Sequence, residues 1–347
     1  MNARDDRGRP AALRGWGGVG AMATGCALAL AAVLLLPLAR SAGTPDEVPG
    51  SGTGPVAAGR QAQDDACRAP EKQTLGPSGA DGPTIDAIKA RRGDKRKLIV
   101  GVDQNSYRWG YRNPNAENAE LEGFDIDLAH RIAEDILGDP DAVQFKAIPT
   151  NKRIEAVQDG DVDMVVRTMT IACDRLAEVA FSAPYFKTGQ QVLAQKSSSI
   201  TGYDDSLARR RICTAAGSTA YTKLKADTEG GRLPSSVDTS VTVPNQLDCL
   251  VRLQLGDVDA VITDGALAAS QAAQDPTVEL KGAPFTTEYY GVAMKHDADD
   301  LVRRVNQVLR DFRADGWQKA YDAWLSATLG SDSAPSKPPA PEYLRRS

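Results

Sequence analysis

Short aliphatic runs alternate with segments of helical periodicity through the middle of the chain. In chain order, the pattern predicts a strand at 97–102, a helix at 125–137, a strand at 143–148, a helix at 151–158 and a strand at 162–170. We expect Asp125 to cap the first helix, Gly138 to end it, and the remaining acids of that helix to lie in its first turn or on a solvated face. Strands and helices that alternate in this way indicate a parallel sheet covered by helices.

The same order of elements recurs further along the chain. Strands are expected at 211–215, 241–243 and 258–264, with helices at 218–226 and 245–255 between them. The tetrapeptide GDVD occurs at 160–163 and again at 256–259, and an aliphatic run follows both copies. The repeat predicts an α/β fold with two lobes of similar build.

The predicted strands of both lobes end in polar residues. Ligands of open α/β sheets bind outside the carboxyl ends of the strands, so these ends are expected to face a shared cleft. The candidates are Thr168, Thr170 and Arg175 from the first lobe and Ser218, Thr219 and Asp264 from the second. The planar fork of Arg175 matches a carboxylate, the helix that opens at Ser218 offers free backbone amides, and Asp264 suits an ammonium group. The set complements an amino acid zwitterion.

Composition narrows the class of protein. The chain has 347 residues, of which 41% are hydrophobic and 25% charged, which is enough for two globular lobes. A net charge of -5, with no basic run interleaved with aromatic residues, excludes a nucleic-acid binder. We expect no metal and no cofactor, because the sequence contains no CxxC spacing and its histidines, His130 and His296, lie far from the cysteines.

The N-terminus combines several arginines within residues 4–14 with an uncharged run over 15–39. Residues 1–40 are therefore expected to form a signal peptide or an uncleaved membrane anchor, with lipidation at Cys26 as the less favoured reading. The protein is expected outside the cytoplasm, attached to the membrane or secreted. Residues 41–82 are predicted to be a flexible tether and 331–347 a disordered tail, because both lack apolar periodicity.

Four cysteines follow the N-terminal segment, and in an exported chain an even number suggests disulfides. Four cysteines allow three pairings, which the sequence alone does not separate. We favour Cys213 with Cys249, because both fall within the second lobe, and Cys67 with Cys173.

Six segments, in this order and spacing, resemble the extracellular solute-binding proteins of family 3, the polar amino acid receptors of ABC importers. They are GFDIDLA at 123–129, DVDMVVRTMTIACDR at 161–175, FSAPYF at 181–186, AGST at 216–219, DVDAVITD at 257–264 and DGWQKAYDAWL at 315–325. The cysteine positions further resemble actinobacterial glutamate- and glutamine-binding lipoproteins. The resemblance implies a type II periplasmic-binding-protein-like fold with a mixed sheet in each lobe: lobe 1 from 83–194 plus 286–330, and lobe 2 from 195–285.

The resemblance also implies a role for each site residue. Arg175 pairs with the ligand α-carboxylate, aided by Thr170 and the backbone amide of Thr219. Asp264 and Thr168 receive the α-ammonium group.

The ligand side chain is read by other residues. Arg167 is the first candidate to meet a β- or γ-carboxylate and Arg108 the second, although a residue that alternates with Thr168 along a strand is equally placed to point away. An acid at Asp103 favours an amide ligand unless a neighbouring arginine compensates its charge. Tyr107 is a candidate to pack over the ligand. Glutamate, aspartate and their amides all stay open.

The expected function is reception of a polar, acidic or amide amino acid by hinge closure, with delivery to the permease of an ABC importer. An amino acid sensor that signals through a membrane partner is one alternative, and a periplasmic dehydratase on the same fold is another. No Ser/His/Asp or Cys/His arrangement is readable, so we do not expect an enzyme.

Overall fold

The computed structural model describes residues 67–115 and 120–345. The expected signal peptide or anchor, and the first part of the expected tether, lie outside the described residues. Within these ranges, none of the helices combines the length and the apolar character that crossing a bilayer requires.

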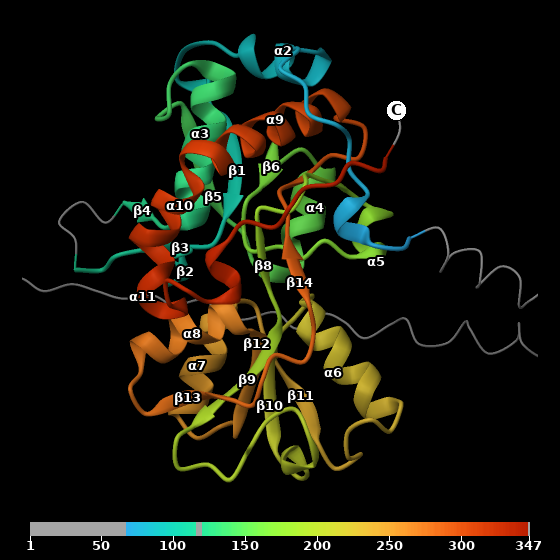
Figure 1. Ribbon diagram of the computed structural model, residues 1–347, viewed down its shortest axis with the longest axis vertical. Coiled ribbons are helices and arrows are strands. Elements are labelled where there is room, and N and C mark those ends of the chain that lie inside the picture. Colours follow the sequence, from blue (N-terminus) through green and yellow to red (C-terminus); the bar gives the residue numbers. More distant parts are fainter. Residues whose placement is uncertain (1–66, 116–119, 346–347) are drawn as a thin grey trace, which may run out of the picture. The chain divides into compact units, whose positions relative to one another are not determined.

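The first lobe is built on a five-stranded sheet (Figure 1). Its strands, in spatial order, are β5 (Val143–Ala147), β1 (Leu98–Val102), β6 (Met164–Val165), β15 (Ala293–Met294) and β7 (Ala180–Phe181). The first three are parallel, and β15 is antiparallel to both of its neighbours. The sheet is therefore mixed, and its antiparallel strand β15 belongs to the segment that returns from the second lobe.

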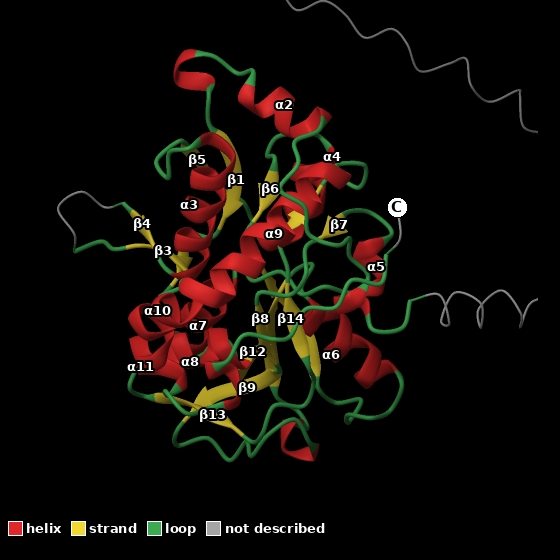
Figure 2. Ribbon diagram, turned by 45° about the horizontal axis from the view of Figure 1, so that its top comes forward, coloured by secondary structure: helices red, strands yellow, loops and turns green. Residues whose placement is uncertain are grey.

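Helices cover this sheet. Helix α3 packs against β1 and lies beside it in Figure 2, and α9 packs against α3. The bounds are α2 (Pro83–Lys89), α3 (Phe124–Leu137), α4 (Arg153–Gln158), α5 (Cys173–Leu176), α9 (Asp299–Asp315), α10 (Trp317–Ala320) and α11 (Ser326–Leu329). A small sheet of β2 (Asn105–Ser106), β3 (Gly110–Arg112) and β4 (Leu121–Glu122) adjoins α3.

The second lobe repeats this plan. Its five strands, in spatial order, are β11 (Asp238–Val243), β10 (Arg211–Ala215), β12 (Ala260–Asp264), β9 (Gln190–Gln195) and β13 (Val278–Lys281). Its helices are α6 (Thr219–Glu229), α7 (Gln246–Gln254) and α8 (Gly265–Gln274). Asn245 and Asp248 form a capping box that fixes the start of α7.

The chain passes between the two sheets twice. The outgoing passage contains β8 (Phe186–Thr188) and the return contains β14 (Glu288–Tyr290), and these two strands pair with each other. In Figure 1 they run side by side between the two sheets. The paired strands form a two-stranded hinge.

Two disulfides have the pairing that the sequence favours. One joins Cys213 on β10 to Cys249 on α7, and both cysteines are fully buried. The other joins Cys67 to Cys173, the first residue of α5.

The described ends of the chain differ from the expected flexible segments. Leu75 is fully buried, and the Thr74 hydroxyl donates to the Phe181 carbonyl at 2.6 Å. At the other end, the backbone amide of Leu344 donates to the Lys72 carbonyl at 2.8 Å. Both segments lack periodicity in sequence, yet their polar backbone groups find partners on the first lobe, so they are ordered.

Candidate functional site

Arg175 lies where the two lobes meet. It sits on the short helix α5 and is 6% exposed. One terminal nitrogen donates to the Thr170 carbonyl at 2.7 Å, and the other donates across to the Gly217 carbonyl of the second lobe at 3.0 Å. Burial lowers the pKa of Arg175. A buried guanidinium with one nitrogen on each lobe is placed to hold an anion and to sense closure.

The start of α6 forms the facing wall. Gly217 has a φ of +73°, which lets the chain turn sharply into the helix. The Ser218 hydroxyl accepts from the Tyr221 amide at 3.1 Å and donates to the Ala215 carbonyl at 2.7 Å, so this side chain acts as the helix cap. A helix start is a common anion-binding site, because its first backbone amides have no partner within the helix.

Asp264 ends β12 and is 8% exposed. Its carboxylate accepts a hydrogen bond from the Tyr290 hydroxyl at 2.7 Å. Burial and the nearby charge of Glu288 raise the pKa of Asp264 to about 7, while Arg175 and Arg153 act in the opposite direction. Asp264 therefore shares one electrostatic environment with Arg175, as the sequence predicts.

The predicted strand at 162–170 is much shorter in the structure, and Thr168 explains why. Its φ of +40° ends the extended conformation and turns the chain. The backbone amide of Thr168 donates to Asp125 at 3.0 Å, and the Tyr185 hydroxyl donates to the same carboxylate at 2.8 Å. Thr170 then makes an isolated bridge to Tyr290.

The expectation for Asp125 is therefore wrong. It is 2% exposed, and Gly123 rather than Asp125 precedes the helix as its cap. Burial raises its pKa to about 7. Its role is to hold the Thr168 turn, which the helical pattern alone does not reveal.

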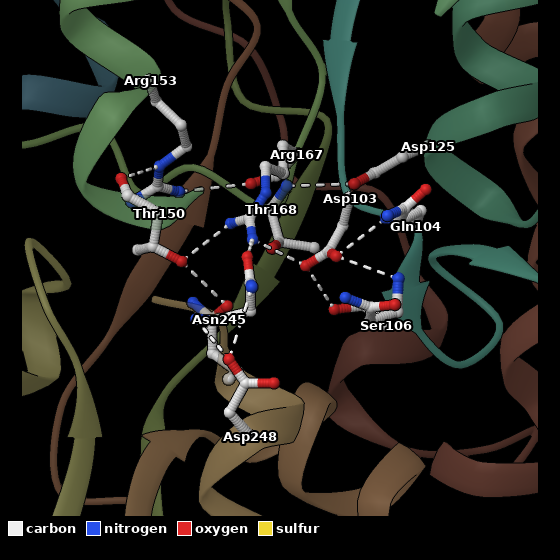
Figure 3. A network of polar contacts seen from close by, with 12 residues as sticks. Asp103, Gln104, Ser106, Asp125, Thr150, Arg153, Arg167, Thr168, Asn245 and Asp248 are labelled. Carbon is white, nitrogen blue, oxygen red and sulfur yellow. Dashed lines mark hydrogen bonds and ion pairs between the residues drawn. The ribbon is translucent and has the colours of Figure 1, made fainter. Parts of the chain in front are cut away.

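Arg167 and Asp103 form a buried ion pair at 2.8 Å (Figure 3). Arg167 is fully buried and also donates to the Thr150 hydroxyl at 3.0 Å and, across the lobe boundary, to the Asn245 side chain at 3.1 Å. Asp103 further accepts from the Ser106 hydroxyl at 2.9 Å. The two residues satisfy each other and link the lobes, so the arginine that would compensate Asp103 is Arg167.

Arg153 was not singled out by the sequence. It is 3% exposed, and its nitrogens donate to the carbonyls of Thr150 at 2.9 Å and Arg167 at 3.2 Å. Burial, followed by the charges of Arg175 and Arg167, lowers its pKa well below the usual range. No carboxylate of the described chain forms an ion pair with it. Its helical segment carries no signal that separates it from a surface arginine.

Arg108 and the aromatic residues around it make contacts with groups other than Arg175. Arg108 donates to the Trp324 carbonyl at 2.9 Å and stands over the Tyr107 ring, 5.1 Å from its centre. Tyr107 also meets Tyr111 edge to face at 5.1 Å. Trp109 is fully buried among core aromatics. These contacts do not bring Arg108 or Tyr107 to Arg175.

Closure of the lobes depends on the absence of a side chain at Gly217. A Cβ there would lie 2.8 Å from the Asn151 Cα of the first lobe. We expect Gly217→Ala to weaken ligand affinity at least about tenfold, or about 1.4 kcal/mol, because the lobes could not approach fully. Gly256→Ala is the matched control, since Gly256 has the same φ of +73° with no atom within 4 Å. Calorimetric titration of both variants decides, and equal affinities would contradict the closure contact.

Comparisons with known proteins bear on the family and the fold of the chain. The family model described as bacterial extracellular solute-binding proteins, family 3, matches residues 98–327. The ABC transporter glutamine-binding protein GlnH of Bacillus subtilis is 34% identical over 70% of this chain and 84% of its own length. The glutamate-binding protein GluB of Corynebacterium efficiens is 30% identical over 68% of this chain and 80% of its own. A solved solute receptor for L-cysteine from Neisseria gonorrhoeae has a TM-score of 0.65 at 26% identity, covering 74% of this chain and 100% of that one.

Proposed function

We propose that this chain, which belongs to the bacterial extracellular solute-binding proteins of family 3, binds glutamate or aspartate where its two lobes meet. Membership of this family makes it a receptor rather than an enzyme. The observation that carries the choice of ligand is Arg153, a buried guanidinium beside Arg175 and Asp264 for which no described carboxylate serves as an ion-pair partner.

The α-carboxylate and the α-ammonium group of the ligand are bound by residues of both lobes. Arg175 and the first amides of α6 hold the α-carboxylate from opposite lobes. Thr170 lies next to Arg175, which donates to its carbonyl, and Asp264 receives the ammonium group. Because these groups come from both lobes, the ligand stabilises the closed arrangement, and its free energy of binding shifts the hinge equilibrium.

Arg153 binds the second carboxylate of the ligand. The repulsion among Arg153, Arg175 and Arg167 favours a ligand with two carboxylates, and Asp103 does not oppose such a ligand because Arg167 neutralises that acid. A ligand with a cationic side chain would add to this repulsion. We infer that the closed receptor then delivers its amino acid to an ABC importer.

Calorimetric titration of the purified protein with glutamate, aspartate, glutamine, asparagine and arginine tests the proposal. We expect glutamate or aspartate to bind with a dissociation constant on the order of micromolar, about 8 kcal/mol, and more tightly than the amides. A preference for arginine, or binding of none of the five, would overturn it.

The affinity is also expected to rise with pH. The pKa of Asp264 is raised to about 7 by burial and by Glu288, so this acid is mostly protonated at pH 6 and mostly ionised at pH 8. Only the ionised form pairs with an ammonium group, which predicts an increase of up to about tenfold between these values. Titration at pH 6, 7 and 8 in buffers of different ionisation enthalpy measures the increase and the proton release. An affinity independent of pH would contradict this role of Asp264.

A further inference from the structure

A second buried acid adjoins the site. Glu288, the first residue of β14, is 6% exposed. Its two oxygens accept hydrogen bonds from the Thr219 hydroxyl at 3.2 Å and the Thr286 hydroxyl at 2.8 Å. No cationic side chain among residues 67–115 and 120–345 forms an ion pair with it. A buried carboxylate without an ion-pair partner is costly. This indicates that a cationic group of a ligand supplies the missing partner.

Glu288 faces the same place as Asp264. Residues two apart on a strand point to one face, and Tyr290, two residues after Glu288, donates its hydroxyl to Asp264 at 2.7 Å. The charge of Glu288 also acts on both Asp264 and Arg175. The two carboxylates therefore lie close to each other and to Arg175.

Gln190 adds an acceptor next to Asp264. It begins β9 and stands directly opposite Asp264 in the antiparallel register, so the two side chains share a face of the sheet. Its side-chain nitrogen donates to the Thr219 hydroxyl at 3.0 Å. Its side-chain oxygen is buried and accepts no hydrogen bond from any described residue. Because buried polar atoms are normally hydrogen-bonded, this oxygen is expected to accept a hydrogen bond from a ligand.

We propose that Glu288 and Gln190 complete the ammonium-binding part of the site together with Asp264. A primary ammonium group offers three donors, which matches three acceptors on three strands. Glu288 lies at the start of the return strand β14, and Gln190 comes just after the outgoing strand β8. The ammonium group thus ties both connecting strands to the ligand. The inference rests on the proposed function, because it concerns the same amino acid.

The test compares glutamate with glutarate, which keeps both carboxylates and lacks the ammonium group. In Glu288→Gln the shape is kept and the charge removed. We expect the glutamate affinity to fall at least about tenfold, as for loss of one charge-assisted hydrogen bond, while the glutarate affinity changes less than twofold. Glu279→Gln on β13 is the control, because Glu279 is half exposed and pairs with Lys281 on the lobe surface.

Each outcome has a defined meaning. Equal losses for glutamate and glutarate, or an unchanged glutamate affinity in Glu288→Gln, would overturn the inference while leaving the proposed function intact. Absence of glutamate binding by the unmodified protein would overturn the proposed function instead. Should circular dichroism show that Glu288→Gln does not fold, Gln190→Met replaces it in the test. This variant removes the unpaired acceptor, so it is expected to lower the affinity for glutamate and not that for glutarate.

Discussion

Replacing Arg175 by alanine is expected to abolish measurable glutamate binding while leaving the protein folded. In the proposed complex the guanidinium forms two charge-assisted hydrogen bonds with the α-carboxylate, each worth about 1.5 to 3 kcal/mol, so the expected loss exceeds about a hundredfold. The variant also removes the contact from Arg175 to the Gly217 carbonyl, which links the lobes. Arg175→Lys keeps the charge and loses the planar fork, so its affinity is expected to lie between the two.

Calorimetry measures the affinity of these variants, and thermal unfolding followed by circular dichroism checks the fold. Arg252→Ala is a suitable control, since Arg252 is exposed on α7 and pairs with Asp257 at 2.9 Å. A folded Arg175→Ala protein that binds glutamate within a few fold of the original would remove Arg175 from the site.

Replacing Arg153 by methionine is expected to change which amino acid is preferred. Methionine fills much of the same volume without the charge, so the closed lobes keep their packing. The glutamate affinity should fall by about 1.5 to 3 kcal/mol, roughly tenfold to a hundredfold, because the side-chain carboxylate loses its counter-charge. The glutamine affinity should change much less, because an amide does not need that charge.

Parallel titrations with glutamate and glutamine measure this ratio. Arg131→Met serves as the control, because Arg131 lies on the surface of α3 and pairs with Asp315. Equal losses for both ligands would show that Arg153 supports the fold of the site and does not read the ligand side chain.

Strand ends and helix starts are visible in the sequence, and for that reason the sequence singles out Arg175, Asp264 and the start of α6 as candidates. Their positions follow from alternating elements, which are local. The sequence does not single out Arg153 and Glu288, because what distinguishes them is that no described residue forms an ion pair with either. A single sequence does not show which charged residues will be buried without such a partner.

Arg167 illustrates the opposite limit. Its residue type suggested a ligand contact, and only the structure reveals that Asp103, 64 positions earlier in the sequence, already neutralises it. Similarly, Asp125 looked like a helix cap, whereas its carboxylate holds the backbone amide of Thr168 at 3.0 Å. Long-range pairing of buried charges depends on the packing of two elements, which periodicity does not encode.

The ends of the described chain meet on the surface of the first lobe. The backbone amide of Leu344 donates to the Lys72 carbonyl at 2.8 Å, and the backbone amide of Arg345 donates to the Thr74 carbonyl at 3.1 Å. A short linker can therefore join them, and new termini can be opened at the exposed turn around Gly231 in the second lobe, where open space surrounds the backbone. Such a circular permutant keeps both hinge strands uncut, and a fluorescent reporter placed at its new ends would move with the second lobe.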